Sequence, residues 1–289
     1  MGPVARAATA VHCAIPPQAR VSMPKVLRAM SDAGVEFPVV AKPDLGMCGF
    51  GVRLVSGQEQ LAAYLAAFPA AETVVLQEYL PQEGEAGIFY AREPGQAQGR
   101  IIGLALRYFP RVVGDGKSTV TQLIAADPRA RRVQGRADHE LGLDASRVPA
   151  VSEVVRLSTI GSTRVGGLYR DGAGHITPAL TAAVDAIARD MPDFYFGRFD
   201  VRYENTAELA AGRNLKIMEI NGAGSEAIEA WDPDTGIVRA FRIIFAKQAT
   251  LFAIAAANRA RGHRPIGLAR LARLHFMQQR LLDAYPPSN

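Results

Sequence analysis

The chain has 289 residues, 48% of them hydrophobic, so it is long enough to bury a substantial core in one large domain or two modest ones. The net charge of +5 does not indicate a nucleic-acid-binding protein, because the arginines near the C-terminus are not regularly interleaved with aromatic residues and are more simply a solvated basic helix face. Cys13 and Cys48 are too few for a disulfide framework and have no partner at metal-ligand spacing, so we expect a cytoplasmic protein.

The N-terminal region gives few signals. Residues 1–22 lack the apolar stretch and cleavage site of a secretory signal, and the Pro16-Pro17 pair predicts irregular structure there. Residues 24–32 then favour a short helix that ends before Gly34. No run of about eighteen uninterrupted apolar residues occurs, so no membrane span is expected.

A glycine-rich hairpin is predicted at residues 39–55, between two short strands. Its loop contains Gly46, Gly49 and Gly51. Glycines let backbone N–H groups approach a phosphate closely, and Lys42 at the end of the first strand would add a positive charge. A strand follows the G-x-x-G-x-G spacing, which excludes the dinucleotide-binding fingerprint. The pattern indicates a flap over a polyphosphate, and a glycine-rich hairpin with one surface lysine is the alternative.

An apolar strand at residues 73–80 ends at a turn, and an alternating run follows it. Glu78 and Glu85 lie on the two sides of this turn. Acceptors so placed could hold an adenine amino group and the ribose hydroxyls, while Tyr79 and Leu80 would offer backbone groups and apolar surface to the base. Two exposed glutamates are the alternative.

Residues 99–113 predict a further strand region, and the GDGKST that follows imitates the end of a phosphate-binding P-loop. The earlier glycine that a P-loop needs would fall at position 111, which is Arg111, so this motif is excluded. A turn is expected instead, with Ser118 or Thr119 as the N-cap of a helix that begins near Val120.

The next segments are less distinctive. Residues 127–157 are arginine-rich and favour a helix and a loop, and residues 158–167 are polar and glycine-rich. The latter could close over a substrate or form an ordinary turn. A helix is predicted at residues 178–189, where Pro178 suits the first helical position.

Two alanine- and arginine-rich helices are predicted at residues 238–258 and 266–284. Their apolar stripes are most simply explained by packing on the body of the domain. A role at a membrane surface is the less favoured alternative.

The chemistry is clearest in residues 194–226, which predict two strands joined by a polar connection. One face of this hairpin is expected to be polar, with Arg198, Asp200, Arg202, Glu219 and Asn221, and the other apolar, with Phe199, Val201, Tyr203, Met218 and Ile220. Antiparallel pairing would bring Asp200, Glu219 and Asn221 together, an all-oxygen set that suits Mg²⁺. Arg198 would neutralise phosphate or carboxylate charge beside it. A solvated hairpin is the alternative.

The order of these features resembles the ATP-grasp superfamily, in particular the carboxylate-amine ligases that include D-alanine–D-alanine ligase. A lysine, a glycine loop, a strand with two glutamates and a late D…E-x-N cluster follow one another between about residues 37 and 233. The segments RYFPRVVGDGKSTVTQLI and LYRDGAGHITPAL also look like the corresponding parts of cyanophycin synthetase and glutathione-forming ATP-grasp enzymes.

This resemblance implies an α+β fold in which two lobes grip ATP between antiparallel sheets, followed by C-terminal helices. It assigns Lys42 to the α- and β-phosphates, Gly46, Gly49 and Gly51 to the loop over the triphosphate, Glu78, Tyr79 and Leu80 to the adenine hinge, and Glu85 to the ribose. It further assigns Asp200, Glu219 and Asn221 to Mg²⁺ or Mn²⁺, and Arg198, with Arg107 as a second candidate, to the transferred phosphate or the acyl phosphate.

By the same resemblance the chain divides into a short N-terminal segment (1–34), a small lobe (35–100), a large lobe (101–235) and a helical segment (236–289). Family members usually have a further N-terminal domain, which is largely absent here, so a homodimer could supply the missing wall. The expected partners are a small-molecule carboxylate and an amine, with neither nucleic acid nor a membrane span. An ATP-grasp phosphotransferase and a nucleotide-binding protein without activity are the alternatives.

Overall fold

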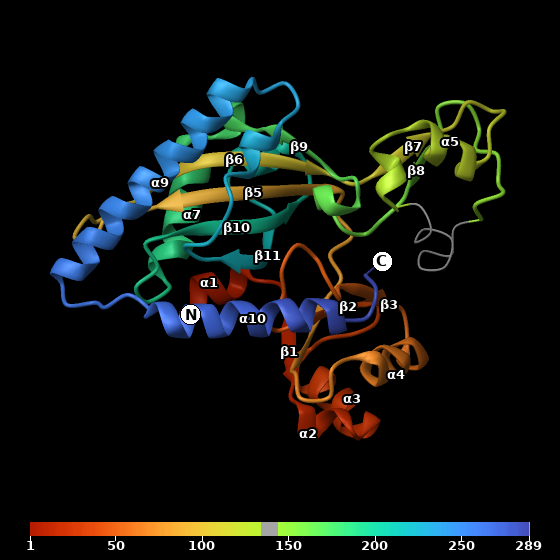
Figure 1. The fold of residues 1–289 in the computed structure, drawn as a ribbon, viewed down its shortest axis with the longest axis horizontal. Coiled ribbons are helices and arrows are strands. Elements are labelled where there is room, and N and C mark those ends of the chain that lie inside the picture. The colour runs from red at the N-terminus through yellow and green to blue at the C-terminus, as the bar shows by residue number, and fades with distance from the viewer. Residues whose placement is uncertain (134–143, 289) are drawn as a thin grey trace. The chain divides into compact units, whose positions relative to one another are not determined.

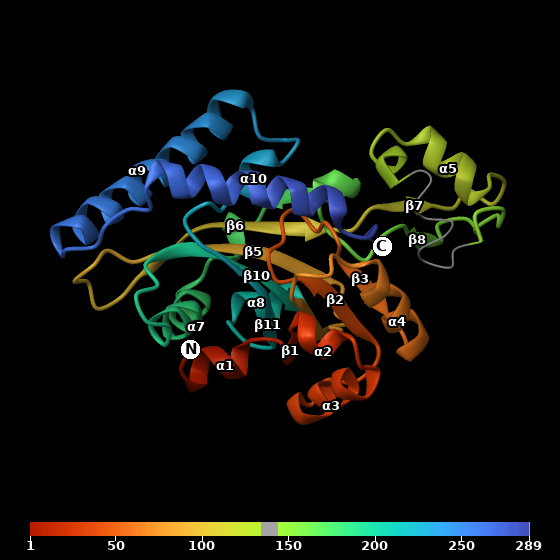
Figure 2. The same cartoon turned by 60° about the horizontal axis from the view of Figure 1, so that its bottom comes forward.

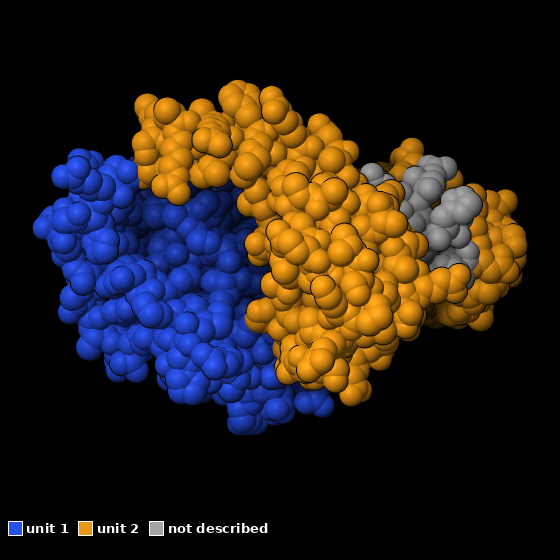
Figure 3. Space-filling view, turned by 90° about the horizontal axis from the view of Figure 1, so that it is seen from below, with its two compact units in different colours: residues 1–10, 80–108, 168–265 blue, residues 11–79, 109–167, 266–289 orange. Residues whose placement is uncertain are grey.

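The computed structural model describes residues 1–133 and 144–288, so part of the expectation for residues 127–157 lies outside the described residues. The chain divides into two compact units, each built from three stretches of sequence and shown in separate colours in Figure 3. Unit 1 comprises residues 1–10, 80–108 and 168–265, and unit 2 comprises residues 11–79, 109–167 and 266–289. The fourfold division made from the sequence stays a prediction.

Unit 1 is built around an antiparallel five-stranded sheet with the strand order β11-β10-β5-β6-β9 (Figure 1). Its elements, in chain order, are α1 (Pro3–Ala8), β5 (Gly84–Ala91), β6 (Arg100–Tyr108), β9 (Leu168–Asp171), the 3₁₀ turn η3 (Ala173–His175), α7 (Pro178–Arg189), β10 (Phe196–Tyr203), α8 (Thr206–Ala210), β11 (Leu215–Asn221), η4 (Ile228–Trp231) and α9 (Ile237–Ala260).

One face of this sheet carries the main core of unit 1. Alternate residues of the central strands, such as Ile88 and Phe199, are buried against Leu180 and Val184 of α7. Helix α7 has the predicted bounds, and the Thr177 hydroxyl caps it by accepting a hydrogen bond from the Leu180 backbone N–H at 3.0 Å. The apolar stripe of α7 thereby fixes which face of the sheet is left for polar side chains.

The opposite face is covered at one end by α9, and Ile228 of η4 packs on it against Ala105 and Tyr169. Phe89, Ala91 and Phe196 there pack against Ile254 of α9. Towards the other end of the same strands, this face carries charged side chains instead. The candidate site residues Arg198 and Asp200 lie there.

Unit 2 contains a four-stranded antiparallel sheet with the order β1-β4-β2-β3 and a separate two-stranded sheet of β7 and β8. Its elements are β1 (His12–Ile15), α2 (Pro17–Arg20), α3 (Met23–Ala33), β2 (Val39–Pro43), β3 (Arg53–Val55), α4 (Gln58–Ala67), β4 (Val74–Glu78), β7 (Arg111–Val113), α5 (Val120–Ala126), η1 (Ala130–Val133), β8 (Val154–Arg156), η2 (Thr163–Val165) and α10 (Leu268–Ala284). Helices α3 and α4 belong to the same unit (Figure 2), and their apolar residues share one buried cluster with the larger sheet. The predicted α+β class, with antiparallel sheets and two C-terminal helices, is confirmed.

The prediction of irregular structure over residues 1–22 was wrong. Helices α1 and α2 both begin at a proline, Pro3 and Pro17, because the first turn of a helix needs no N–H partner. Strand β1 forms because β4 provides its ladder, with His12 opposite Gln77. Pairing between distant segments therefore decides the structure of this region.

The C-terminal helices bury fewer side chains than expected. In α9 only Lys247 and Ile254 are buried, and in α10 only Leu282. Among the described helices, α9 is also long and apolar enough to cross a membrane by length and composition, which is weak evidence for a span. No span was expected there because Arg239, Arg242 and Lys247 interrupt the apolar run.

Candidate functional site

The candidate site is centred on Asp200, in the middle of β10 on the charged face of the unit 1 sheet. Asp200 pairs with Glu219 of β11 on one side and with Gly87 of β5 on the other. Its side chain is almost completely buried, at 2% exposure. A methyl group added at Gly87 would lie 2.6 Å from Ile228 and 3.3 Å from Asp200 Oδ1, so glycine leaves the room that this carboxylate occupies.

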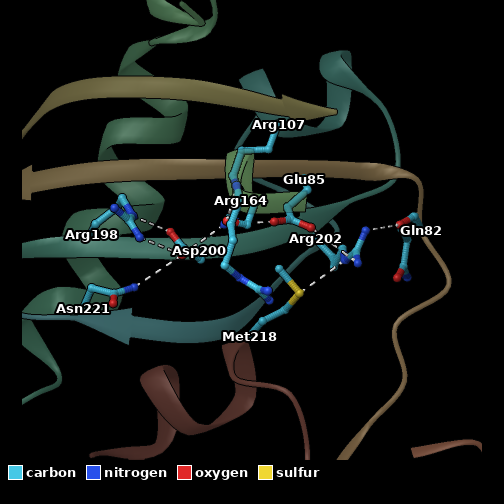
Figure 4. A network of polar contacts seen from close by, with 10 residues as sticks. Gln82, Glu85, Arg107, Arg164, Arg198, Asp200, Arg202, Met218 and Asn221 are labelled. Atoms are coloured by element: carbon cyan, nitrogen blue, oxygen red, sulfur yellow. Dashed lines mark hydrogen bonds and ion pairs between the residues drawn. The ribbon is translucent and has the colours of Figure 1, made fainter. Parts of the chain in front are cut away.

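Two arginines bind the Asp200 carboxylate (Figure 4). Arg198 donates from Nε to Oδ1 at 2.6 Å and from Nη2 to Oδ2 at 3.0 Å, which is the bidentate geometry that favours arginine over lysine. Arg107 of β6 donates from Nη1 to Oδ2 at 3.1 Å. Asn221 donates its amide to the same oxygen at 3.3 Å. The predicted grouping of Arg198, Asp200 and Asn221 on one face is confirmed.

A second buried carboxylate, Glu85, joins this cluster. Its Oε1 lies 2.9 Å from Arg107 Nη1, and its Oε2 lies 3.4 Å from Arg202 Nη2. Arg202 further donates to the backbone carbonyl of Gln82 at 3.1 Å. The resemblance assigned Glu85 to the ribose. In the structure Glu85 is 3% exposed and forms ion pairs with two arginines.

The carboxylates of this cluster stabilise the charged forms of its arginines. Burial alone would lower the pKa of Arg107, but the nearby carboxylates of Glu85 and Asp200 raise it above its ordinary value. Arg198 follows the same pattern, with burial opposed by the charge of Asp200, and its pKa is also raised. Both guanidinium groups therefore remain cationic at any physiological pH.

One N–H donor of Arg107 has no acceptor among the described residues. This donor is Nε, which is buried. A buried guanidinium donor without an acceptor is costly, and an anionic ligand would satisfy it. The cluster is therefore suited to receive a phosphate or carboxylate.

The expectation that Met218 points into the core was wrong. A β-bulge shifts the register between Asp200 and Val201, so that Glu219 pairs with Asp200 while Ile217 pairs with Val201. The extra residue, Met218, stays on the charged face, where its sulfur accepts from Arg202 Nε at 3.2 Å. Ile217 takes the core position instead.

Asp200, Glu219 and Asn221, the residues expected to bind a metal ion, have side-chain oxygens of the kind that a hard cation prefers. In the described ranges no group of three or more His, Cys, Asp or Glu side chains is placed to hold a metal ion. The expected set consists of two carboxylates at paired positions and one amide, which suits a hard cation that retains waters. Both Asp200 oxygens accept from arginine, so a cation would have to share this carboxylate with Arg107 and Arg198.

Unit 2 contains the residues predicted to hold the triphosphate. Lys42 of β2 donates from Nζ to Gln77 Oε1 of β4 at 3.1 Å. Gly49 and Gly51 have positive φ angles of 74° and 71°, which explains glycine at both positions, whereas Gly46 does not require one. The assignment of this loop to the triphosphate stays a prediction.

Carbonyl oxygens of this glycine loop are held by side chains of the same unit. Arg164 donates to the carbonyls of Cys48 and Gly49 at 3.1 and 3.2 Å. Tyr64 and Tyr285 donate to the carbonyls of Gly51 and Leu45. Arg164, in the segment suspected of closing over a substrate, therefore supports the loop, a role that sequence patterns did not reveal.

The predicted adenine hinge lies where the chain passes from unit 2 to unit 1, between Tyr79 and Leu80. Glu78 is turned towards β1, because its Oε1 accepts from the Val11 backbone N–H at 2.7 Å. Tyr79 is half-buried and Leu80 is buried. The hinge assignment stays a prediction.

A buried ion pair on the same face of the unit 1 sheet was also missed. Lys247 of α9 pairs with Glu229 of η4, and its Nζ lies 3.7 Å from the centre of the Phe89 ring. Gly103 makes room for this pair, since an added methyl group would lie 2.1 Å from Glu229 Oε1. The one available signal was a lysine within an apolar helical run.

Comparison with known proteins finds relatives among solved structures only. No protein-family model and no curated protein matches the chain. The bifunctional glutathione synthetase from Pasteurella multocida matches with 18% identity and a TM-score of 0.41 over 84% of this chain. D-alanine–D-alanine ligase from Helicobacter pylori matches with 13% identity and a TM-score of 0.42 over 86% of this chain. The chain resembles these ligases in fold.

D-alanine–D-alanine ligase from Bacillus anthracis complexed with ATP also matches, with 13% identity and a TM-score of 0.45 over 90% of this chain. The chain spans 34% of the glutathione synthetase and 56% and 65% of the two D-alanine–D-alanine ligases. Since every TM-score is below 0.5, the functional proposal rests on the side chains of the site and on the sequence resemblance.

Proposed function

We propose that this protein is an ATP-dependent ligase that joins a carboxylate to an amine through an acyl phosphate. The observation that carries the proposal is the buried cluster in which Arg107 and Arg198 converge on Asp200, with a spare donor on Arg107. Two permanently charged guanidinium groups on a largely buried sheet face favour a ligand with several negative oxygens.

The chemistry needs such a site because a carboxylate resists direct attack by an amine. Oxide is a very poor leaving group, and the anion repels a nucleophile. In the proposed reaction a carboxylate oxygen bonds to the γ-phosphorus of ATP while the bond to the β-phosphate oxygen breaks and ADP leaves. The amine nitrogen then bonds to the acyl carbon, phosphate leaves, and the nitrogen loses a proton to solvent.

The protein's part in this reaction is positioning and charge neutralisation. Arg198 and Arg107 would orient the transferred phosphoryl group and the acyl phosphate. Asp200, Glu219 and Asn221 would hold Mg²⁺ or Mn²⁺, which when bound neutralises phosphate charge. Lys42 and the glycine loop of unit 2 would bind the triphosphate. We place the reaction in the cytoplasm, where the free thiols of Cys13 and Cys48 suit a reducing environment.

An isotope experiment tests this reaction. The protein is incubated with ATP, Mg²⁺ and a mixture of amino acids whose carboxylates carry ¹⁸O, and the released phosphate is examined by mass spectrometry. An acyl phosphate transfers one labelled oxygen to phosphate, and Glu219→Gln, at an exposed position, should abolish this release. Phosphate without label would mean simple ATP hydrolysis and would contradict the proposal.

Two other functions give different results in the same experiment. A phosphotransferase would leave a stable phosphorylated product and no free phosphate. A nucleotide-binding protein without activity would consume no ATP while still showing ATP-dependent stabilisation.

A further inference from the structure

Helix α9 exposes a row of large apolar side chains along one side. Ile237, Phe241, Phe245 and Phe252 follow one another at spacings of four, four and seven residues, which places them on one side of the helix. Their exposed fractions lie between 51% and 73%. The rings of Phe241 and Phe245 stack at 5.9 Å, so the stripe is an ordered surface. Large apolar side chains that are grouped and exposed mark a surface that contacts something apolar.

The opposite side of α9 is fastened to the sheet of unit 1. Lys247 forms the buried ion pair with Glu229, and Ile254 packs against Phe89 and Phe196. A helix held in this way along one side keeps its stripe facing outwards. It can lie on a membrane surface, but it could not cross a bilayer without breaking the buried ion pair and exposing the sheet.

The charge around this stripe indicates what it contacts. From Thr235 to Leu282 the sequence has nine lysine and arginine residues and no aspartate or glutamate; Lys247 is paired with Glu229 and Arg239 with Asp171, which leaves seven. Arg242 and Arg259 of α9 are exposed. In unit 2, α10 repeats the combination, with Leu268 and Phe276 exposed at 83% and 65% and three arginines on the same helix. A protein partner would require a surface that is both apolar and acidic, whereas an anionic bilayer offers both properties at once.

We propose that the exposed stripe of α9 binds the surface of an anionic lipid bilayer, with Phe241, Phe245 and Phe252 inserted at the level of the headgroups and the arginines against lipid phosphates. This proposal does not depend on the ligase proposal, since none of these residues belongs to the candidate site.

Vesicle flotation tests the proposal. The full chain is mixed with vesicles of phosphatidylcholine alone, or of phosphatidylcholine with about a third phosphatidylglycerol, and the floated fraction is measured. Binding is expected to the anionic vesicles only and to weaken as salt is raised. The double variant Phe241→Ser/Phe245→Ser and the single variant Arg242→Glu should each weaken binding at least about tenfold.

A matched control is Val151→Ser in unit 2, which removes an apolar side chain of 72% exposure that belongs to neither C-terminal helix and should bind like the parent. Circular dichroism of each variant verifies the fold. The proposal is overturned by equal binding to neutral vesicles, or by unchanged binding of the folded double variant. It is equally overturned if the stripe instead mediates self-association or binding to DNA while vesicles float without protein.

Discussion

One nitrogen of Arg107, Nη1, lies 2.9 Å from Oε1 of Glu85 and 3.1 Å from Oδ2 of Asp200. A single guanidinium on β6 therefore joins carboxylates from β5 and β10, and the side chains of all three residues are at most 12% exposed. Removing such a shared partner leaves two buried anions, which is far more costly than losing a surface ion pair.

The substitution Arg107→Met should therefore lower the free energy of unfolding by about 3 to 5 kcal/mol, as measured by urea denaturation. Arg100→Met provides the control on the same strand, because Arg100 pairs with Glu93 at 3.9 Å with both side chains more than half exposed. That variant should change stability by less than about 0.5 kcal/mol. Equal effects of the two substitutions would contradict the assignment of a tightly coupled buried cluster.

Nucleotide affinity tests the role of Lys42. Lys42→Ala should raise the dissociation constant of ATP at least about tenfold, or 1.4 kcal/mol, because a charge beside the phosphates is lost. Lys25→Ala, on an exposed position of α3, should leave ATP binding unchanged. Isothermal titration calorimetry measures both. Unchanged affinity in Lys42→Ala would show that this lysine does no more than bridge β2 and β4 through Gln77.

The glycine loop offers a test of backbone geometry. Gly49 has a φ of 74°, and a methyl group there would lie 2.9 Å from Ile160, so Gly49→Ala should destabilise the fold by about 1 to 2 kcal/mol. Gly46→Ala is the control in the same loop, because the nearest atom to an added methyl group lies 3.8 Å away. Thermal unfolding distinguishes them. Similar stabilities would mean that the loop does not adopt this conformation.

The buried Lys247 predicts a pH dependence. Desolvation lowers the pKa of Lys247 to about 8 despite the opposing charge of Glu229. Between this value and the ordinary lysine pKa of about 10.5, the unfolded chain binds a proton that the folded chain does not, so this group's contribution to stability rises with pH. Below pH 8 both states are protonated and the contribution is constant.

Nuclear magnetic resonance can measure this pKa directly, since the chain has five lysines and their Cε signals are easily separated. One signal, absent in Lys247→Arg, should titrate with a midpoint near 8. Five ordinary midpoints would contradict the buried position of Lys247.

Local patterns in the sequence predicted much of this structure. The hairpin of β10 and β11 could be predicted because its strands are close in the chain and alternate regularly. Helix α5 could be predicted because Thr119 and Gln122 form a capping box, with reciprocal hydrogen bonds at the helix start. In each case the deciding interactions lie within a few residues of one another.

The remaining features depend on contacts between distant segments. The bulge at Met218 depends on how β10 pairs with β11, and the contact of Arg107 with Glu85 depends on the register of β6 against β5. The burial of Lys247 depends on η4 and β5 meeting α9. The polar face of the site was thus predicted from alternation, whereas its buried ion pairs required the assembled sheet.

The central claim is that Asp200 and Glu219 help to bind ATP with a divalent cation, and thermal unfolding tests it most directly. The parent and Glu219→Gln are compared without ligand, with ATP, with Mg²⁺ and with both, and Glu219 is exposed, so the variant should fold normally. A ligand at about a hundred times its dissociation constant stabilises by about 2.7 kcal/mol. We predict a rise in melting temperature that needs both ATP and Mg²⁺ and is lost in Glu219→Gln. No rise in the parent, or an equal rise in the variant, would contradict the account.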